Sequence, residues 1–220
     1  MKSYIQGADD NISAKINSIK YGKSDRMWAV SDKITIGWRS VLPEPPANDS
    51  DFTKMELNQV ASMTKSLKSE QIDLIKMVDV NPRSVFEKMI NKHNLKDYKN
   101  EVDKAWTLVR PIMLNLKWKF NRPRPYQLAE AYGIDIKVLL TDTHHTPAYP
   151  SGHSAEAAMM GYVLAEHYPE HSSEIFDKID LAGKARVLQG VHYPSDNDAS
   201  MVITAALWQD IKLNIITGEK

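Results

Sequence analysis

The chain contains 220 residues, 42% of them hydrophobic, which is enough to form a domain with a proper core. Its 28 basic residues balance its 28 acidic residues, so no overall positive field indicates nucleic-acid binding and no acidic field indicates a solvating tail. The absence of cysteine excludes disulfide bonds, thiolate metal sites and a cysteine nucleophile.

The N-terminal sequence MKSYIQGADDNISAKINS lacks the apolar segment of a secretory signal. The longest apolar runs, such as MVITAALW at residues 201–208, are far shorter than the roughly 18–20 residues that a membrane-spanning helix needs. We therefore expect a soluble, cytoplasmic protein without a membrane span.

Residues 1–50 are expected to form an irregular N-terminal arm. The segment DKITIGW at residues 32–38 alternates weakly between apolar and polar residues, which predicts a short strand or an extended arm. The segment VLPEPPANDSD at residues 41–51 contains three prolines and indicates a linker. We expect residues 51–220 to form a helical core, within a single domain that covers residues 1–220.

After residue 51 the spacing of the apolar residues is helical. Pro111 predicts a kink in one long helix, and the prolines of NRPRPYQ at residues 121–127 end that helix. The predicted helices cover residues 54–67, 69–80, 81–94, 98–120, 151–167, 172–189 and 194–215. The sequence therefore predicts an all-α fold, a bundle of about six or seven helices with short connections.

The first segment that does not look like core packing is KWKFNRPRP at residues 117–125. Lys117 and Arg124 lie seven residues apart, close to two helical turns, so they would face the same way if the helix continued. An arginine between two prolines presents a rigid fork that suits two phosphate oxygens, and the lysine adds a point charge. The alternative is a basic helix end that complements the helix dipole. Arg122 does not fit the seven-residue offset, so we place it at the rim of such a site.

The second segment is AYPSGHSAEA at residues 148–157, where polar residues precede a run of helix formers. The first backbone N–H groups of a helix bind anions well, and Gly152 lets the backbone approach the ligand closely. Ser151 adds a hydroxyl group and His153 adds a proton that titrates near neutral pH. The alternative is that Ser151 caps the helix and His153 is an ordinary residue of its first turn.

The third segment is ARVLQGVHYPSDND at residues 185–198. Asp196 follows His192 by four residues, with a proline between them that begins the next helix. The carboxylate can then bind one imidazole nitrogen, fix the tautomer and leave the other nitrogen as a nucleophile. Arg186 precedes the histidine by six residues. The alternative is that Asp196 lines the first helical turn and His192 is a satisfied loop residue.

Together the three segments resemble the type 2 phosphatidic acid phosphatase (PAP2) superfamily, which includes bacterial non-specific acid phosphatases and vanadium-dependent haloperoxidases. The family pattern K-x6-R-P, P-S-G-H and S-R-x5-H-x3-D is similar to this sequence in order and in internal spacing. The departure is Ala185, which stands where the family has a serine that supports the site by hydrogen bonding. Because that serine is not the nucleophile, we expect the chemistry to survive its absence.

The resemblance implies hydrolysis of small phosphate monoesters in two steps, without a metal or another cofactor. In this scheme His192 attacks phosphorus, Asp196 orients His192, and His153 first donates and then accepts a proton. The groups expected to hold the phosphate oxygens are Lys117, Arg124, Arg186, the hydroxyl of Ser151 and the backbone N–H of Gly152.

Two other functions remain open from the sequence. The first is a haloperoxidase that uses vanadate as cofactor, whereas vanadate would only inhibit a phosphatase by occupying its phosphate site. The second is a phosphate-binding protein of the same fold without catalysis. His144 and His145 could line the pocket entrance, or form a metal site with Asp142 as third ligand, or belong to a polar loop. The resemblance leaves a homo-oligomer open.

Overall fold

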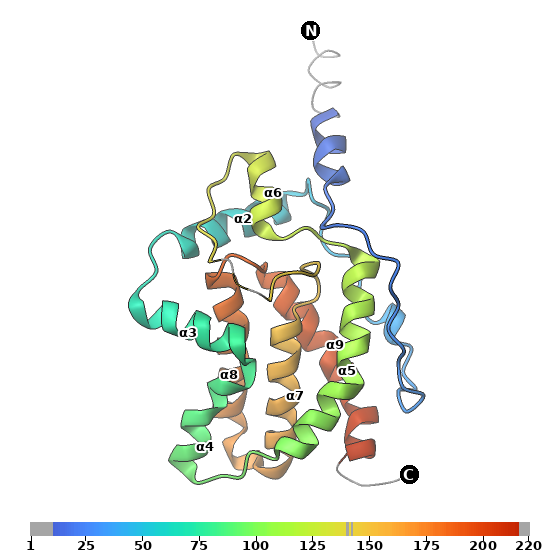
Figure 1. Cartoon of the computed structure of the whole chain (residues 1–220), viewed down its shortest axis with the longest axis vertical. Helices are drawn as coiled ribbons and strands as arrows, with labels where there is room; N and C mark the ends of the chain where they lie inside the picture. The colour runs from blue at the N-terminus through green and yellow to red at the C-terminus, as the bar shows by residue number, and fades with distance from the viewer. Residues whose placement is uncertain (1–10, 140, 142, 216–220) are drawn as a thin grey trace.

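The computed structural model describes residues 11–139, 141 and 143–215, and these residues form an all-α bundle without a β-strand. Four long helices lie side by side along the long axis of the molecule, and α2 and α6 cover one end of them (Figure 1). The long helices are α5 (Lys99–Phe120), α7 (Gly152–His167), α8 (Ser172–Leu188) and α9 (Pro194–Ile215). The remaining elements are η1 (Trp38–Ser40), α2 (Asp51–Thr64), α3 (Ser69–Val80), η2 (Pro82–Phe86), α4 (Glu87–His93), α6 (Pro125–Ala129), η3 (Glu130–Tyr132) and η4 (Pro169–His171).

The predicted all-α class is confirmed, and the differences lie at the ends of helices and in short elements. Residues 32–38 contain turns and the first residue of η1 and form no strand, and residues 11–18 before them are helical. The predicted helix 81–94 is divided into η2 and α4. The segment 121–127 does not continue α5, but a new short helix, α6, begins within it at Pro125. Proline is favourable at the first position of a helix, so its presence ends one helix and starts another.

Local sequence explains where the helices begin and end. Ser50 caps α2, since its Oγ accepts a hydrogen bond from the backbone N–H of Thr53 at 3.1 Å. At the C-terminal end of α5, Asn121 adopts a left-handed conformation with φ of 51°, and its backbone N–H donates to the carbonyl of Lys117. Asparagine tolerates this conformation better than most residues, and it turns the chain out of the helix. α5 passes through Pro111 as one continuous helix.

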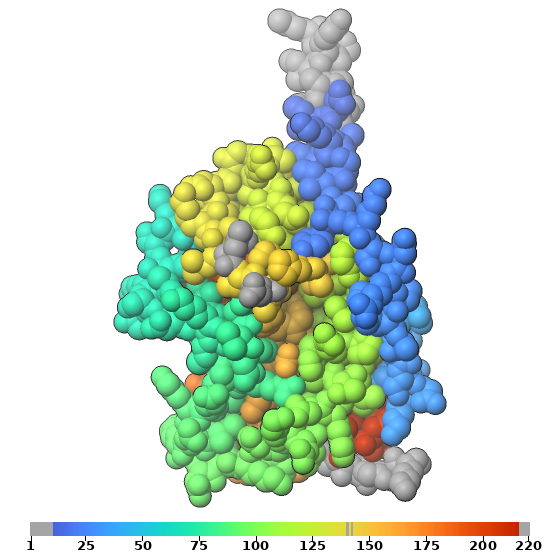
Figure 2. All heavy atoms as spheres, in the orientation of Figure 1, coloured from blue at the N-terminus to red at the C-terminus, as the bar shows by residue number. Residues whose placement is uncertain are grey.

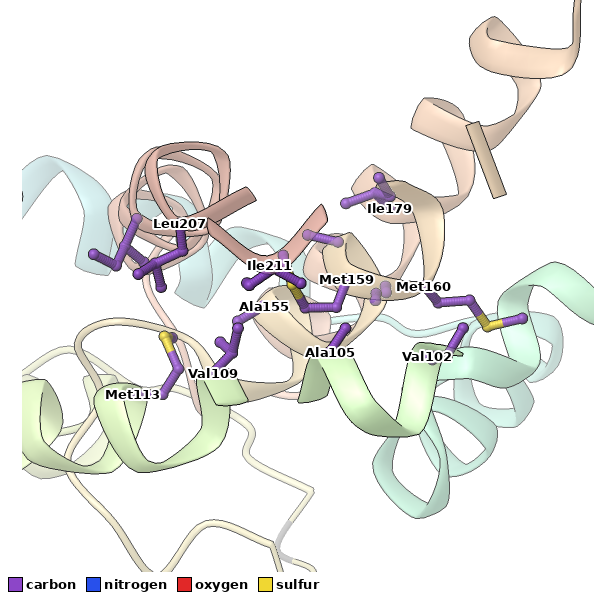
Figure 3. Packing of buried hydrophobic residues seen from close by; sticks show 14 of the residues in the cluster. Val102, Ala105, Val109, Met113, Ala155, Met159, Met160, Ile179, Leu207 and Ile211 are labelled. Carbon is purple, nitrogen blue, oxygen red and sulfur yellow. The ribbon is translucent and has the colours of Figure 1, made fainter. Parts of the chain in front are cut away.

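The hydrophobic core lies between α7 and the three long helices around it (Figure 3). α7 is buried on most of its surface because its middle is built from small and apolar residues, from Ala155 to Leu164. Gly161 allows the closest approach, since a Cβ atom there would overlap the side chain of Ile179 on α8. This packing fixes the N-terminus of α7 relative to α5 and α9.

A second, smaller core fastens α2 and α6 over the end of the bundle. It contains Leu57 of α2, Leu128 of α6 and Tyr193, which precedes α9, together with Ile16 of the N-terminal arm. These contacts bring α2 to the start of α9, although the two helices are far apart in the sequence. No helix in the described part of the chain has a stretch long and apolar enough to cross a membrane.

Candidate active site

A cavity of about 210 Å³ lies beside α5 and the first turn of α7, close to the covered end of the bundle. Five of the residues selected from the sequence line it, and they come from α5, from the first turn of α7 and from the segments before α6 and α9: Lys117, Arg124, Gly152, His153 and His192. The side chains of all three sequence segments therefore meet around one space.

Lys117 lies in the last turn of α5 and is 4% exposed. Its Nζ donates hydrogen bonds to the carbonyls of Pro147 at 2.6 Å and Ala148 at 3.2 Å, which join α5 to the loop before α7. Burial, followed by the charge of Arg124, lowers the pKa of the Lys117 ammonium well below its ordinary value. An anion bound in the cavity would offset the charge of Arg124 and favour the protonated form of this amine.

Arg124 reaches the cavity by a different route from the one that the spacing suggests. α5 ends at Phe120, and Arg124 is the extended residue directly before α6, with φ of −70° and ψ of 155°. Its Nε donates to the carbonyl of Thr146 at 2.9 Å, and its Nη1 donates to the carbonyl of Val191 at 2.8 Å. Burial, with the charge of Arg186 second, lowers the pKa of Arg124 to about 10. The guanidinium is thus held rigidly against the cavity wall.

His192 lies between a hydrogen-bond acceptor and a hydrogen-bond donor. Its Nδ1 is 2.9 Å from Oδ2 of Asp196, and its Nε2 is 2.9 Å from Nη1 of Arg124. A carboxylate can only accept and a guanidinium can only donate, so Nδ1 carries the proton and Nε2 keeps its lone pair. Burial, followed by the charge of Arg124, lowers the pKa of His192 well below its ordinary value. The ring is therefore neutral, with an unprotonated Nε2 beside the cavity.

His153 stands in the first turn of α7, and its ring is oriented by the backbone of α3. Its Nε2 is 3.1 Å from the carbonyl oxygen of Asp79, which accepts the Nε2 proton. Burial, with the charge of Arg186 second, lowers the pKa of His153 to about 3. Gly152 lines the cavity beside it, and a Cβ atom at that position would lie 3.7 Å from Cε of Lys117.

Ser151 and Arg186 are buried behind the cavity wall. The Oγ of Ser151 caps α7 by accepting from the N–H of Ser154 at 3.4 Å, as the alternative reading of this serine expected. Arg186 forms an ion pair with Asp79 and donates from Nη2 to Thr143 at 3.2 Å. Its Nε has no hydrogen-bond partner among the described residues. Burial lowers the pKa of the Arg186 guanidinium. Ala185, next to Arg186, packs in the main core.

Asp79 was not selected from the sequence, although it organises one side of the site. Hydrogen bonds reach its Oδ1 from Arg186, Thr141, Thr143 and Gln189. Burial opposes its ionisation, but the hydrogen bonds from Thr143 and Arg186 prevail and lower the pKa of Asp79 to about 2. The only sequence signal is an acidic residue within the apolar last turn of α3, which is too common to indicate a site.

The prediction for Arg122 is wrong, because this residue is buried and does not lie at the rim. It is 2% exposed, and its Nη1 lies 2.7 Å from Oδ1 of Asp196. Its Nη2 lies 3.0 Å from Oε2 of Glu56, on α2. Burial opposes its charge, but the carboxylate of Asp196 prevails and raises the pKa of Arg122 above its ordinary value. The seven-residue offset misses this role, since Arg122 faces Asp196 and not the cavity.

Glu56 was also missed, and it supports the start of α9. Its Oε1 accepts the backbone N–H of Ser195 at 2.7 Å, and its Oε2 accepts the Ser195 hydroxyl at 2.8 Å. The carboxylate is 1% exposed and pairs with Arg122, which in turn pairs with Asp196. A chain of contacts thus extends from α2 to the imidazole of His192.

His144 and His145 do not line the cavity, and their rings lie 4.5 Å apart between centroids. Burial, followed by the charge of His145, lowers the pKa of His144. Asp142, the third ligand of the metal site considered above, lies outside the described residues. Within the described ranges, no three histidine or acidic side chains are grouped as metal ligands would be.

Comparisons with known proteins identify a family and several distant relatives. Residues 105–212 match the family model described as the PAP2 superfamily. The chain is 38% identical over 58 residues to a non-specific acid phosphatase of Salmonella typhimurium, covering 26% of this chain and 23% of that protein. It is 31% identical over 58 residues to an acid phosphatase of Zymomonas mobilis, covering 26% of this chain and 22% of that protein. The matched segment therefore spans about a quarter of the length of these curated relatives.

Among solved structures, the chain is similar to a transmembrane PAP2 type phosphatidylglycerolphosphate phosphatase from Bacillus subtilis. The TM-score is 0.40 at 18% sequence identity, and the alignment covers 99% of this chain and 89% of that chain. The three motif segments meet around one cavity within the region that the family model matches. The chain belongs to the PAP2 superfamily.

Proposed function

We propose that this protein is a phosphatase that hydrolyses phosphate monoesters through a phosphohistidine on His192. The observation that carries the proposal is the ring of His192, which Asp196 and Arg124 hold in one tautomer with Nε2 beside a cavity lined by cations. A scaffold that only binds phosphate has no need of an oriented, neutral imidazole. The likeness to acid phosphatases over 58 residues supports the same reaction class.

In the first step, the hydrogen bond from Nη1 of Arg124 to Nε2 of His192 is released, Nε2 attacks phosphorus, and the bond from phosphorus to the leaving oxygen breaks. His153 gives its proton to that oxygen, so the leaving group departs as an alcohol. The ring of His192 becomes cationic, and its Nδ1 proton stays hydrogen-bonded to Asp196. In the second step, water gives a proton to His153 and attacks phosphorus, the bond from phosphorus to Nε2 breaks, and phosphate leaves.

The proton-donor role of His153 depends on the substrate. Burial and the charge of Arg186 hold its pKa at about 3, so the free enzyme has little of the protonated ring at neutral pH. A phosphate dianion next to the ring would favour the protonated form and raise this pKa. The enzyme would therefore gain its general acid as it binds its substrate.

The charge on the phosphate oxygens is stabilised by groups that are already in position. Lys117, Arg124 and the N-terminus of α7 at Gly152 surround the cavity. Arg186 adds positive potential from behind the wall, where its charge also lowers the pKa of His192 and of His153. Ser151 contributes by capping the helix whose first N–H groups face the anion.

The test is release of phosphate from an aryl phosphate by the wild type and by His192→Ala. We expect the variant to lose at least about a thousandfold in kcat, because no other group can take the place of the nucleophile. His171→Ala is the matched control, since His171 lies in η4 and does not line the cavity. Unchanged turnover in His192→Ala would remove the nucleophile assignment.

A second measurement separates the alternatives. Rapid acid-free quenching should trap an acid-labile, base-stable phosphoryl group on the wild type and none on His192→Ala. Vanadate should compete with substrate because it mimics the transferred phosphoryl group. Halide oxidation by the vanadate-loaded protein with peroxide would favour a haloperoxidase, and tight phosphate binding without turnover would favour a non-catalytic protein.

A further inference from the structure

A second cavity, of about 580 Å³, adjoins the candidate active site. Glu156 lines both cavities, so the two spaces meet at this side chain. Along α7, His153 lines the first cavity and Met160 lines the second, with Glu156 between them. Residues three and four apart share one face of a helix, so one face of α7 runs along both cavities, which together are called the groove below.

α5 forms a wall of the same groove. Arg110 and Trp106 line the first cavity, and Val102 and Lys99 line the second cavity farther toward the N-terminus of the helix. The opposite wall comes from η2 and α4, including Ile90. Figure 2 shows this groove as a hollow with orange atoms of α7 at its floor, between light-green α5 and the blue-green residues of η2 and α4.

The direction of the groove follows from the proposed chemistry. His153 gives its proton to the leaving oxygen, so the leaving group lies beside His153. The groove continues from there past Glu156, one helical turn along α7. A leaving group that extends beyond the scissile bond would therefore enter the second cavity.

The two ends of the groove differ in charge. In the second cavity the cations are already neutralised: Arg83 pairs with Glu156 at 2.9 Å and with Asp103, which also pairs with Lys99. Two further carboxylates line this cavity, those of Glu87 and Asp97, and neither has an ion-pair partner in the described part of the chain. The second cavity is thus acidic, whereas the first is cationic.

We infer that this groove binds the leaving group and selects extended phosphate monoesters with uncharged or cationic hydrogen-bond donors at the far end. The inference rests on the proposed phosphatase function. Glu87 and Asp97 accept hydrogen bonds or attract a positive charge, and they repel a second anionic group. The apolar side chains of Ile90, Val102 and Met160 contact the hydrocarbon part between the phosphate and the terminal group.

The experiment compares substrates of equal length that differ only in the terminal group. These are aminohexyl phosphate, hydroxyhexyl phosphate and the phosphate ester of hydroxyhexanoic acid, with phenyl phosphate as a short reference. We expect the wild-type kcat/KM to fall in that order along the series. The variant Glu87→Lys, Asp97→Lys should lower the amino-to-carboxylate ratio of kcat/KM by about tenfold, since each exposed charge contributes about twofold to fivefold. Phenyl phosphate should be hydrolysed at the wild-type rate by this variant.

The matched control is Glu70→Lys, Asp73→Lys, which changes the net charge equally on α3, outside both cavities. An unchanged ratio in the groove variant, or an equal change in the control, overturns the inference and leaves the phosphatase proposal intact. If the wild-type protein hydrolyses phenyl phosphate but does not discriminate among the three hexyl substrates, the inference is also overturned and the phosphatase proposal stays intact. A wild-type protein that hydrolyses none of the four substrates overturns the proposed function, and the inference with it.

Discussion

At the scale of single residues, the proposed chemistry depends on which nitrogen of His192 carries the proton. Asp196 accepts from Nδ1 and Arg124 donates toward Nε2, so both contacts favour the same tautomer. The hydrogen bonds at the two nitrogens therefore stabilise the same tautomer together, and a change of partner at either nitrogen should alter the reactivity of the other.

Asp196→Asn is expected to lower kcat by roughly 10³- to 10⁴-fold with a smaller effect on KM. The asparagine amide can donate to Nδ1, which would move the imidazole proton to Nε2 and remove the nucleophilic lone pair. Steady-state kinetics with an aryl phosphate measures the effect, and Asp198→Asn, an exposed position on the same helix, is the control. Wild-type kcat in Asp196→Asn would contradict the tautomer argument.

The pH dependence should reveal the two histidines separately. His192 must be neutral, so its depressed pKa places the acidic limb well below the ordinary pKa of histidine. His153 must be protonated, so the rate falls as pH rises through its pKa, which is about 3 in the free enzyme. Because kcat/KM reports the free enzyme and kcat reports the complex, we expect the optimum of kcat at a higher pH than that of kcat/KM.

The pH profiles of kcat and of kcat/KM across the acidic and neutral range test this expectation, once they are corrected for ionisation of the substrate. His153→Asn should lose the basic limb because no protonated ring remains. A basic limb that persists in this variant would assign the general acid to another group.

At the scale of helices, α2 acts on the site without contacting the cavity. Glu56 of α2 pairs with Arg122, and Arg122 pairs with Asp196, through side chains that are at most 2% exposed. Removing one member of a buried pair leaves the other charge uncompensated. Glu56→Gln should therefore lower the free energy of unfolding by about 3 kcal/mol. It should also lower kcat more than it raises KM, since Asp196 loses its rigid support.

The double variant Glu56→Gln, Arg122→Met tests this coupling, because it removes both buried charges. We expect it to lose less stability than the sum of the two single variants, as measured by urea denaturation of all four proteins. Losses that add to within about 0.5 kcal/mol would show that the two residues act independently.

The same scale shows how far the sequence alone can lead. Apolar periodicity and caps predicted the long helices, because these signals are local. The short helix α6 was missed because its prolines were read only as the end of α5. The motifs led to Lys117, Arg124, His153 and His192, which line one cavity, but they did not predict that Arg186 lies behind its wall, and they missed Glu56 and Asp79. Glu56 binds Arg122, 66 residues away, and Asp79 binds Arg186, 107 residues away. Each of the two acids belongs to an otherwise ordinary helix.

At the scale of the whole molecule, a net charge of zero conceals a separation of charge. The 28 basic and 28 acidic residues balance over the chain, yet the candidate active-site cavity is lined by cations and the adjoining cavity by carboxylates. Composition indicated only that the chain has no overall field of either sign. Three-dimensional packing decides where the two signs collect, and a substrate with one anionic and one neutral or cationic end would match this polarity.

The position of the two buried acids, Glu56 and Asp79, in the sequence has a consequence for which part of the chain the site needs. The matched family region, residues 105–212, contains the proposed nucleophile and the guanidinium groups, whereas Glu56 and Asp79 precede it in the sequence. A fragment trimmed to residues 105–212 would leave Arg186 without its carboxylate and Arg122 with one of its two. The helices outside the matched family region thus supply the counterions of these two arginines. A relative whose motifs are all intact would lose its activity if these helices diverged and the two acids were lost.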